Sequence, residues 1–310
     1  MPTRERTLSL MSPADNVARV VIFGGTGFLG RHIAARVLEA GIDIRVAVRH
    51  PEAVPIGRGI SAVAADVRNE AAVAAALQGC DAAINAVGHY VEKGAATFQA
   101  VHEVGAHNVA RQARAQALKR LVHISGIGAV LNSPSHYVHS RARGEHLVRQ
   151  AFPETVILRP SVMFAPDDHF VNAIARIARF TPVLPLFGSG RTRLQPVFVD
   201  DVANAALAAL QRPETRGRTY ELGGPDILSY RELIKRILLH ARHRRLLLPV
   251  PFQAWALLAI LCGPLPAPPI TKAQVTLMRA DNVVANDALV LAELGVAPTA
   301  LDAVLPEYRM

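Results

Sequence analysis

The chain has 310 residues, of which 51% are hydrophobic and 19% charged, a balance that excludes a globally disordered protein and allows one large domain or two smaller ones. Its formal net charge of +9 favours anionic partners such as phosphates or an acidic lipid surface. The basic residues are scattered without the clustered arm typical of nucleic-acid binding, which disfavours a nucleic-acid partner. Two cysteines, Cys80 and Cys262, exclude a disulfide-stapled scaffold and a cysteine-based zinc domain.

The first half of the chain has the rhythm of a parallel sheet. Residues 1–16 are a polar lead-in that lacks the apolar run of a signal peptide. Short apolar runs then alternate with Ala-rich helical patterns, as in successive βαβ units. The predicted strands are Ala18–Phe23, Ile44–Val48, Ile60–Ala65, Ala82–Val87, Leu121–Ser125 and Thr155–Leu158. The predicted helices are Leu29–Ala40, Glu70–Leu77, Phe98–Ala117 and Ala142–Ala151. We therefore predict an α/β fold with a Rossmann doubly wound parallel sheet over residues 17–160.

The second half, residues 161–310, is predicted to form a smaller mixed C-terminal lobe for substrate binding or docking. Prolines and loops separate three predicted helices there, Val171–Phe180, Val202–Leu210 and Tyr230–His240. A strand near 219–222 is expected to return to the main sheet.

The strongest motif joins the first predicted strand to the first predicted helix. It reads GGTGFLG over residues 24–30. Glycines at this spacing allow a tight turn, a close approach of the backbone to a pyrophosphate, and close packing of helix on strand. The helix N-terminus then attracts phosphates. The strand–turn–helix context predicts a dinucleotide-binding loop made by Gly24, Thr26, Gly27, Phe28, Leu29 and Gly30.

The tip of the second predicted strand bears on the choice of dinucleotide. An acidic residue there would hydrogen-bond the adenosine ribose 2′-hydroxyl of NAD(H), whereas a cation would hold the 2′-phosphate of NADP(H). The sequence has Arg49 and His50 at this tip and no acid, and an arginine can bind a phosphate through two hydrogen bonds. We therefore favour NADP(H) over NAD(H), with Arg49 as the main ligand and His50 or Arg58 as helpers.

Two further strand ends are predicted to line the dinucleotide. Asp66 and Val67 follow the third strand, where the adenine ring is expected. Ala86, Val87 and Gly88 follow the fourth, near the ribose and phosphates, and their small side chains leave the edge open to a flat ligand.

A candidate catalytic group follows the fifth strand. Ser125 ends that strand, and Tyr137 and Arg141 are four residues apart, so that on a helix they share a face. The phenol of a free tyrosine has a pKa of about 10, and a neighbouring cation makes it a better proton donor and acceptor near neutral pH. Ser125 could polarise a substrate carbonyl beside Tyr137.

No metal site is predicted from the sequence. The chain has 12 histidines, but their closest pairs lack acidic or cysteine companions at ligand spacing. The acidic pair at 167–168 is expected to begin a helix, where carboxylates are favoured, and the pair at 200–201 is expected to cap the helix predicted over Val202–Leu210.

One uncharged segment bears on membrane contact. Residues 246–270 follow the basic run Arg242-His243-Arg244-Arg245 and contain six prolines. These leave one uninterrupted helix, Phe252–Gly263, about 18 Å long, which is too short for a hydrocarbon core of about 30 Å. Two interpretations stay open: a buried helix that covers a substrate cleft, or an exposed apolar surface beside a cationic run that contacts lipid or a membrane complex.

Several segments together resemble a known family. The glycine loop, the Ser125/Tyr137 pair, LRPS at 158–161, QPVFVDDV at 195–202 and YELGGP at 220–225 look like an extended or atypical short-chain dehydrogenase/reductase of the NAD-dependent epimerase/dehydratase kind. The longer segments RPSVMFAPDDHFVN, QPVFVDDVANA and the proline-rich LPVPF…PPITKAQV…DNVV are similar to the branch that contains the NADPH-binding accessory subunit of respiratory complex I and its bacterial relatives. The resemblance covers about residues 17–300.

This resemblance implies a Rossmann domain and a small lobe that form a cleft between them. It also implies a dinucleotide that lies over the glycine loop and over the residues matching Arg49, Asp66, Val67, Ala86, Val87, Gly88, Tyr137 and Arg141. We count His50 and Pro160 among the expected cofactor contacts as well.

Arg141 departs from the family pattern, which is Tyr-x-x-x-Lys. Lysine reaches the nicotinamide ribose as a compact ammonium and can take part in a proton relay, whereas arginine is planar, bulkier and always charged. Cofactor binding survives such a change more easily than turnover does. Alternatively, Arg141 does both jobs, since its charge still acts on Tyr137.

Three hypotheses therefore stay open. The first is an NADP(H)-binding protein whose cofactor is structural or senses redox state, with peripheral docking to a membrane or respiratory complex through residues 242–270. The second is an active NADPH-dependent oxidoreductase or epimerase that uses Tyr137, Ser125 and Arg141 on a hydrophobic (quinone- or isoprenoid-like) or nucleotide-sugar substrate. The third is a reductase-like, nucleic-acid-associated regulator, suggested by the net charge. The abundance of Arg and Ala suggests a bacterial source and a cytoplasmic location.

Overall fold

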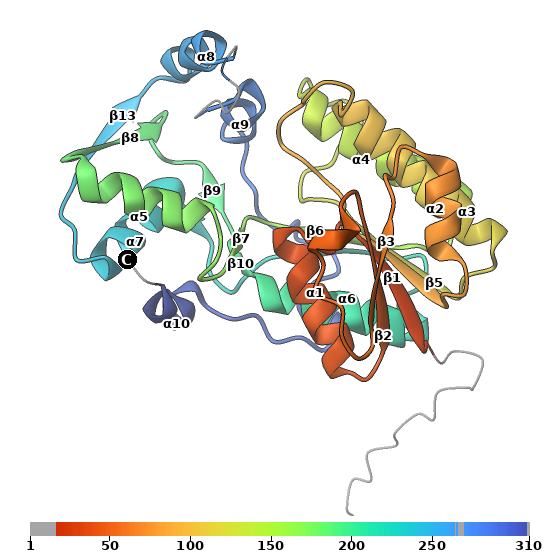
Figure 1. Ribbon diagram of the computed structural model, residues 1–310. Coiled ribbons are helices and arrows are strands. Elements are labelled where there is room, and N and C mark those ends of the chain that lie inside the picture. Colours follow the sequence, from red (N-terminus) through yellow and green to blue (C-terminus); the bar gives the residue numbers. More distant parts are fainter. Residues whose placement is uncertain (1–16, 264, 266–269, 309–310) are drawn as a thin grey trace, which may run out of the picture.

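The protein is built around one parallel sheet (Figure 1). The structure, a computed structural model, describes residues 17–263, 265 and 270–308, so the predicted lead-in and the prolines at 264, 266, 268 and 269 lie outside the described residues. The sheet has seven strands in the order β11-β6-β5-β4-β1-β2-β3, all parallel to their neighbours. They are β1 (Arg19–Phe23), β2 (Asp43–Val48), β3 (Ile60–Ala64), β4 (Ala82–Asn85), β5 (Arg120–Ile124), β6 (Val156–Pro160) and β11 (Thr219–Leu222). The predicted Rossmann doubly wound sheet is confirmed.

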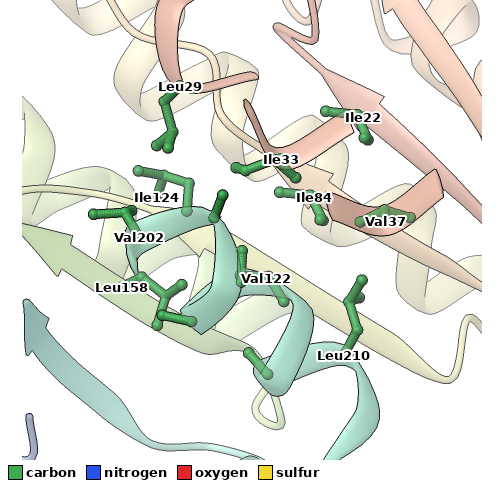
Figure 2. Close-up of a cluster of buried hydrophobic side chains, with 14 of the residues drawn as sticks. Ile22, Leu29, Ile33, Val37, Ile84, Val122, Ile124, Leu158, Val202 and Leu210 are labelled. Atoms are coloured by element: carbon green, nitrogen blue, oxygen red, sulfur yellow. The ribbon is translucent and has the colours of Figure 1, made fainter. Parts of the chain in front are cut away.

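Helices cover both faces of this sheet. One face carries α1 (Phe28–Glu39) and α6 (Val199–Gln211), and the other carries α2 (Glu70–Leu77), α3 (Ala106–Ala115) and α4 (His136–Ala151). Figure 2 shows the first of the two cores, in which Ile33 of α1, Ile84 of β4 and Val202 of α6 are fully buried. Each such side chain contributes about 1.5–3 kcal/mol to folding. Cover on both faces explains why the predicted strands are continuous apolar runs.

Two helices differ from their predicted extents. The predicted helix over 98–117 divides into a π-helix (Gln99–Gly105) and α3. α4 begins at His136 rather than at Ala142, because the Ser135 side chain accepts a hydrogen bond from the backbone N–H of Val138 at 3.5 Å and caps the helix. Tyr137 therefore lies in the first turn of α4, and Arg141 lies one turn later.

The smaller lobe follows the carboxyl end of β6 (Figure 1). Among the described residues it contains three two-stranded sheets. They pair β7 (Met163–Phe164) with β10 (Val197–Phe198), β9 (Arg193–Leu194) with β12 (Leu228–Ser229), and β8 (Val183–Phe187) with β13 (Leu246–Val250). Its helices are α5 (Phe170–Phe180), α7 (Tyr230–His240), α8 (Phe252–Leu261), α9 (Lys272–Leu277) and α10 (Leu301–Val304). A third apolar core packs α5 and α7 against residues 301–308.

A partly buried ionic group joins the sheet to a segment that returns from the smaller lobe. Arg159 of β6 donates hydrogen bonds to both carboxylate oxygens of Glu145 on α4, at 2.9 and 2.7 Å, and to Glu221 of β11 at 3.3 Å. The second oxygen of Glu221 accepts a hydrogen bond from the backbone N–H of Ala285 at 2.9 Å. The segment that returns from the smaller lobe is thereby fixed to the sheet.

The two acidic pairs predicted to begin helices differ in outcome. Asp168 accepts a hydrogen bond from the backbone N–H of Val171 at 2.6 Å, at the start of α5. The pair at 200–201 lies inside the first turn of α6, whose N-cap, Phe198, has no side-chain capping bond. The capping prediction is wrong there, because α6 begins at Val199, before the pair. The first carboxylate of the pair accepts a hydrogen bond from Arg36 of α1 at 2.8 Å.

The uncharged segment after residue 245 is not buried. Four large side chains of α8 are between 41% and 68% exposed, namely Leu257, Leu258, Ile260 and Leu261. Ala259 is the residue of this helix that is buried. The interpretation of α8 as a buried helix over a substrate cleft is therefore wrong. Within the described ranges, we find no helix that combines the length and the apolar character needed to cross a membrane.

Candidate functional site

The glycine loop connects β1 to α1 at the centre of the sheet, where the strand order reverses between β1 and β4. Open α/β sheets bind their ligands at this crevice. Gly24 has φ +79° and faces the end of β4 so closely that a Cβ would lie 2.9 Å from the carbonyl oxygen of Ala86. A Cβ on Gly30 would overlap the carbonyl oxygen of Gly24. Both positions therefore require glycine, and the exposed Thr26 and Gly27 open α1 toward the crevice.

The ends of β2 and β3 lie side by side. Val48 pairs with Ala64, and the backbone N–H of Ala65 donates to the carbonyl of Val48 at 2.8 Å, so the next residues, Arg49 and Asp66, are neighbours at the carboxyl edge. Arg49 is exposed, and within residues 17–263, 265 and 270–308 no carboxylate forms an ion pair with it.

The two predicted helpers of Arg49 differ in position. His50 is exposed next to it, with Nδ1 3.2 Å from a carboxylate oxygen of Glu52. Arg58 precedes β3 and therefore lies at the amino edge of the sheet. Its predicted role as a helper is wrong, because the two edges of a five-residue strand are about 16 Å apart.

Arg68 is a site residue that the sequence motifs did not single out. Its Nε and Nη2 atoms donate to the Asp66 carboxylate at 2.9, 3.1 and 2.6 Å. These hydrogen bonds from Arg68 lower the pKa of Asp66 below its ordinary value. The signal available in the sequence was the spacing: Arg68 follows Asp66 by two residues, so the two opposite charges lie in the same turn after β3.

The other predicted dinucleotide contacts line the same edge. Val67 is buried against Gly105 of the π-helix. At the end of β4 the backbone N–H of Ala86 donates to Phe23 at 3.0 Å, and that of Val87 donates to the Asn85 side chain at 3.2 Å.

Tyr137 sits in an aromatic enclosure and is 8% exposed. Its ring stacks on Tyr90 at 5.2 Å between centroids and meets Phe98 and His102 edge to face at 5.5 Å. The interaction with Tyr137 raises the pKa of Tyr90. Arg141 lies over the Tyr137 ring with its Cζ atom 5.5 Å from the centroid, so the two share a face of α4 as predicted.

Arg141 is buried and fills the space over Gly88. Its Nη1 donates to the carbonyl oxygen of Ile124 at 3.1 Å, and a Cβ on Gly88 would overlap its Nη2. Its Nε atom and the Oγ atom of Ser125 are buried, and neither has a hydrogen-bond partner in the part of the chain that the structure describes. Buried polar atoms are normally paired. These two, with the glycine cradle, therefore fit a ligand that brings hydroxyl or carbonyl groups between β4, β5 and α4, as the ribose and nicotinamide of a dinucleotide would.

Pro160, the remaining predicted contact, is buried at the end of β6, and its carbonyl accepts a hydrogen bond from the backbone N–H of Ile127 at 3.2 Å. This hydrogen bond joins the end of β6 to the loop that follows Ser125.

A chain of hydrogen bonds supports Tyr137 from behind. The backbone N–H of His89 donates to Nε2 of His102 at 3.4 Å, and Nδ1 of His102 lies 2.9 Å from Oγ of Ser140, which donates to the carbonyl of Tyr137 at 2.8 Å. With Nε2 as an acceptor, the ring carries its proton on Nδ1. Burial lowers the pKa of His102 to about 2 and that of His123, which lies beside Asn85, to about 3. Both imidazoles are thus neutral.

Within the part of the chain that the structure describes, no group of three or more His, Cys, Asp or Glu side chains could hold a metal ion.

Comparisons with known proteins agree with this geometry. Residues 20–223 match the family model described as the NAD dependent epimerase/dehydratase family. The chain is 30% identical over 296 residues to NADH dehydrogenase [ubiquinone] 1 alpha subcomplex subunit 9 of Arabidopsis thaliana, covering 89% of this chain and 73% of that protein. It is 32% identical over 196 residues to the ceramide reductase of Caulobacter vibrioides, covering 63% and 61%.

Among solved structures, the Thermus thermophilus UDP-glucose 4-epimerase in complex with NAD superposes with a TM-score of 0.68 at 20% identity, covering 94% of this chain and 99% of that one. This likeness extends the shared fold over both the sheet and the smaller lobe. The glycine cradle and the matched range of 204 residues therefore place the chain in the NAD-dependent epimerase/dehydratase family of short-chain dehydrogenases/reductases, with relatives among the complex I accessory subunits and the reductases.

Proposed function

We propose that the protein binds NADP(H) in preference to NAD(H) and holds it as a structural or redox-sensing cofactor while the smaller lobe docks on a membrane surface. The observation that carries the cofactor assignment is Arg49, an exposed guanidinium at the carboxyl edge of β2 beside the glycine loop, unpaired with any carboxylate of the described residues. In this position it can form a bidentate contact with a 2′-phosphate.

When bound, the dinucleotide would supply hydride chemistry at its nicotinamide ring. Ser125 and Arg141 would orient the ribose and the carboxamide through the Oγ and Nε atoms, which have no hydrogen-bond partner among the described residues. The engagement of Arg141 with Ile124 and Gly88 supports a role in holding the dinucleotide.

Replacing Arg49 by Gln is expected to weaken NADPH binding by about 10- to 100-fold, because one charge-assisted contact to a phosphate contributes roughly 1.5–3 kcal/mol. NADH binding should change little. Fluorescence titration of nucleotide-free protein with both nucleotides gives the two Kd values. Arg58→Gln is the matched control, since Arg58 is exposed at the opposite edge of β3. Equal affinity of the wild-type protein for NADPH and NADH would remove the cofactor assignment.

The docking surface combines apolar and basic side chains at the end of the smaller lobe. Phe180 at the end of α5, Leu239 near the end of α7 and Leu246 at the start of β13 are 78%, 81% and 65% exposed. Their segments meet there, because Nε of Arg245 donates to the carbonyl of Ala178 at 2.6 Å. From there β13, in which Leu248 is 49% exposed, leads to α8 and its exposed leucines (Figure 1).

Exposed cations lie on the same segments as this apolar surface. Arg176, Arg179, Arg242 and Arg244 are exposed on α5 and on the run that precedes β13. An apolar patch with a basic rim matches the interface of a membrane that carries anionic lipid. A respiratory complex as the docking partner would bring the chain to the same surface, in line with the Arabidopsis relative.

We expect the purified protein to sediment with vesicles that contain about 30% of the anionic lipid phosphatidylglycerol. It should not sediment with purely zwitterionic vesicles. The double variant Arg242→Gln/Arg244→Gln should bind roughly 10- to 30-fold more weakly, because each arginine near an anionic surface contributes about 1 kcal/mol. Arg114→Gln/Arg218→Gln, two exposed arginines away from this lobe, is the control. Unchanged sedimentation of the first variant would exclude the lipid surface, leaving a protein partner for the same patch.

Hydride transfer to a hydrophobic substrate stays a prediction. Tyr137, Ser125 and Arg141 gather at one edge of the sheet, and the exposed Val130 and Leu131 form an apolar rim beside them. This arrangement is compatible with the ceramide reductase relative.

A further inference from the structure

We propose that Arg68 determines the preference for a 2′-phosphorylated dinucleotide by neutralising Asp66, which leaves Arg49 free to bind the extra phosphate. This inference rests on the proposed function, and it gives a role to a residue outside the glycine loop and the Tyr137 group.

The Arg68–Asp66 pair is built into a rigid turn. Three hydrogen bonds of 2.6 to 3.1 Å join the guanidinium to the two carboxylate oxygens, and the backbone N–H of Arg68 donates to Asp66 at 2.9 Å. The backbone N–H of Asn69 donates to the carbonyl of Asp66 at 2.9 Å. The Asn108 side chain donates to the carbonyl of Val67 at 3.0 Å. The pair is therefore held at the carboxyl edge of β3 independently of any ligand.

Asp66 would otherwise compete with a phosphate for Arg49. The pairing of Val48 with Ala64 places the two residues at adjacent strand ends, and the charge of Arg49 adds to the effect of Arg68 in lowering the pKa of Asp66. An unpaired carboxylate here would attract Arg49 and repel a phosphate group with up to two negative charges. Arg68 and Asp66 neutralise each other when they are paired. The remaining positive charge of the three side chains is then that of Arg49.

The alternative is that Arg68 binds the phosphate itself. Substitution of Asp66 distinguishes the two roles of Arg68. If Arg68 acts by neutralising the carboxylate, its removal matters only while the carboxylate is charged. If Arg68 is a direct ligand, its removal costs the same affinity whether residue 66 is Asp or Asn. Asn keeps the carbonyl oxygen with which residue 66 can accept a hydrogen bond from adenine.

The test is a thermodynamic cycle with binding as its readout. Kd values for NADPH and for NADH are measured on nucleotide-free wild type, Arg68→Gln, Asp66→Asn and the double variant. We expect Arg68→Gln to lower the ratio of NADPH to NADH affinity about tenfold. In the Asp66→Asn background the same change should leave the ratio within about twofold. Arg19→Gln, which removes the partner of Asp43 at the amino edge of the sheet, is the matched control for loss of an Arg–Asp pair.

Four other results overturn the inference. An equal loss in both backgrounds makes Arg68 a direct ligand, and an equal loss for NADPH and NADH makes it structural. If Arg49→Gln lowers the ratio and Arg68→Gln does not, the role of Arg68 falls while the NADP(H) assignment stands. If neither change alters the ratio, both fall.

Discussion

Replacing Gly30 by Ala is expected to abolish dinucleotide binding, with a loss of at least about 100-fold for NADPH and NADH alike. The added Cβ would overlap the carbonyl oxygen of Gly24 and approach the Cα atom of Gly25 to 2.8 Å. These are backbone atoms, so relief requires α1 to move away from β1. Such a shift takes the first turn of the helix away from the pyrophosphate position. Isothermal titration of the purified variant measures the loss.

Gly57→Ala is the matched control for that experiment. Gly57 precedes β3, and the nearest atom to an added Cβ lies 4.0 Å away on Ile60. We expect native affinity and native thermal stability from this variant. Because Gly30→Ala also disturbs the packing of α1, its Tm is measured in the absence of nucleotide. Retention of wild-type affinity by a folded Gly30→Ala protein would show that the dinucleotide does not rest on this loop.

The sheet was predictable from two local patterns. Continuous apolar runs indicate strands that are covered on both faces, and the glycine loop indicates a tight turn from a strand into a helix. The order of the strands and the adjacency of Gly24 to Ala86 follow from the same βαβ rule. The placement of Tyr137 and Arg141 on one face of α4 was predictable from their spacing of four residues.

Features that depend on long-range side-chain contacts were not predictable. The pairing of Arg68 with Asp66 needs the turn after β3, and the stacking of Tyr90 on Tyr137 needs the loop after β4 to fold over α4. Asp200 was predicted to cap α6, but its carboxylate accepts a hydrogen bond from Arg36 of α1, a contact between two helices far apart in the sequence. The apolar sequence of α8 was compatible with burial or exposure, since its composition is uniform around the helix and gives no face a preference.

Two buried neutral histidines make the fold sensitive to mild acid. Burial lowers the pKa of His102 to about 2 and that of His123 to about 3, against about 6.5 in an unfolded chain. Below pH 6.5 the unfolded chain therefore takes up protons that the folded protein cannot, and stability falls as the pH falls toward those two values. Each group costs about 1.4 kcal/mol per pH unit, so both together cost about 4 kcal/mol at pH 5.

That loss is a large part of the 5–15 kcal/mol typical of a folded domain, and urea unfolding at pH 7 and pH 5 measures it. The carboxylates with a lowered pKa, such as Asp66 and Asp81, titrate below about pH 4. Burial raises the pKa of Asp201 and lowers that of His89, so the contribution of each buried histidine is isolated by substitution. His123→Gln should remove about half of the difference between the two pH values. His146→Gln, at an exposed position of α4, should remove none. If NMR of the wild-type protein shows either buried ring protonated while folded at pH 5, the ring is not held neutral by burial, and the acid sensitivity needs another origin.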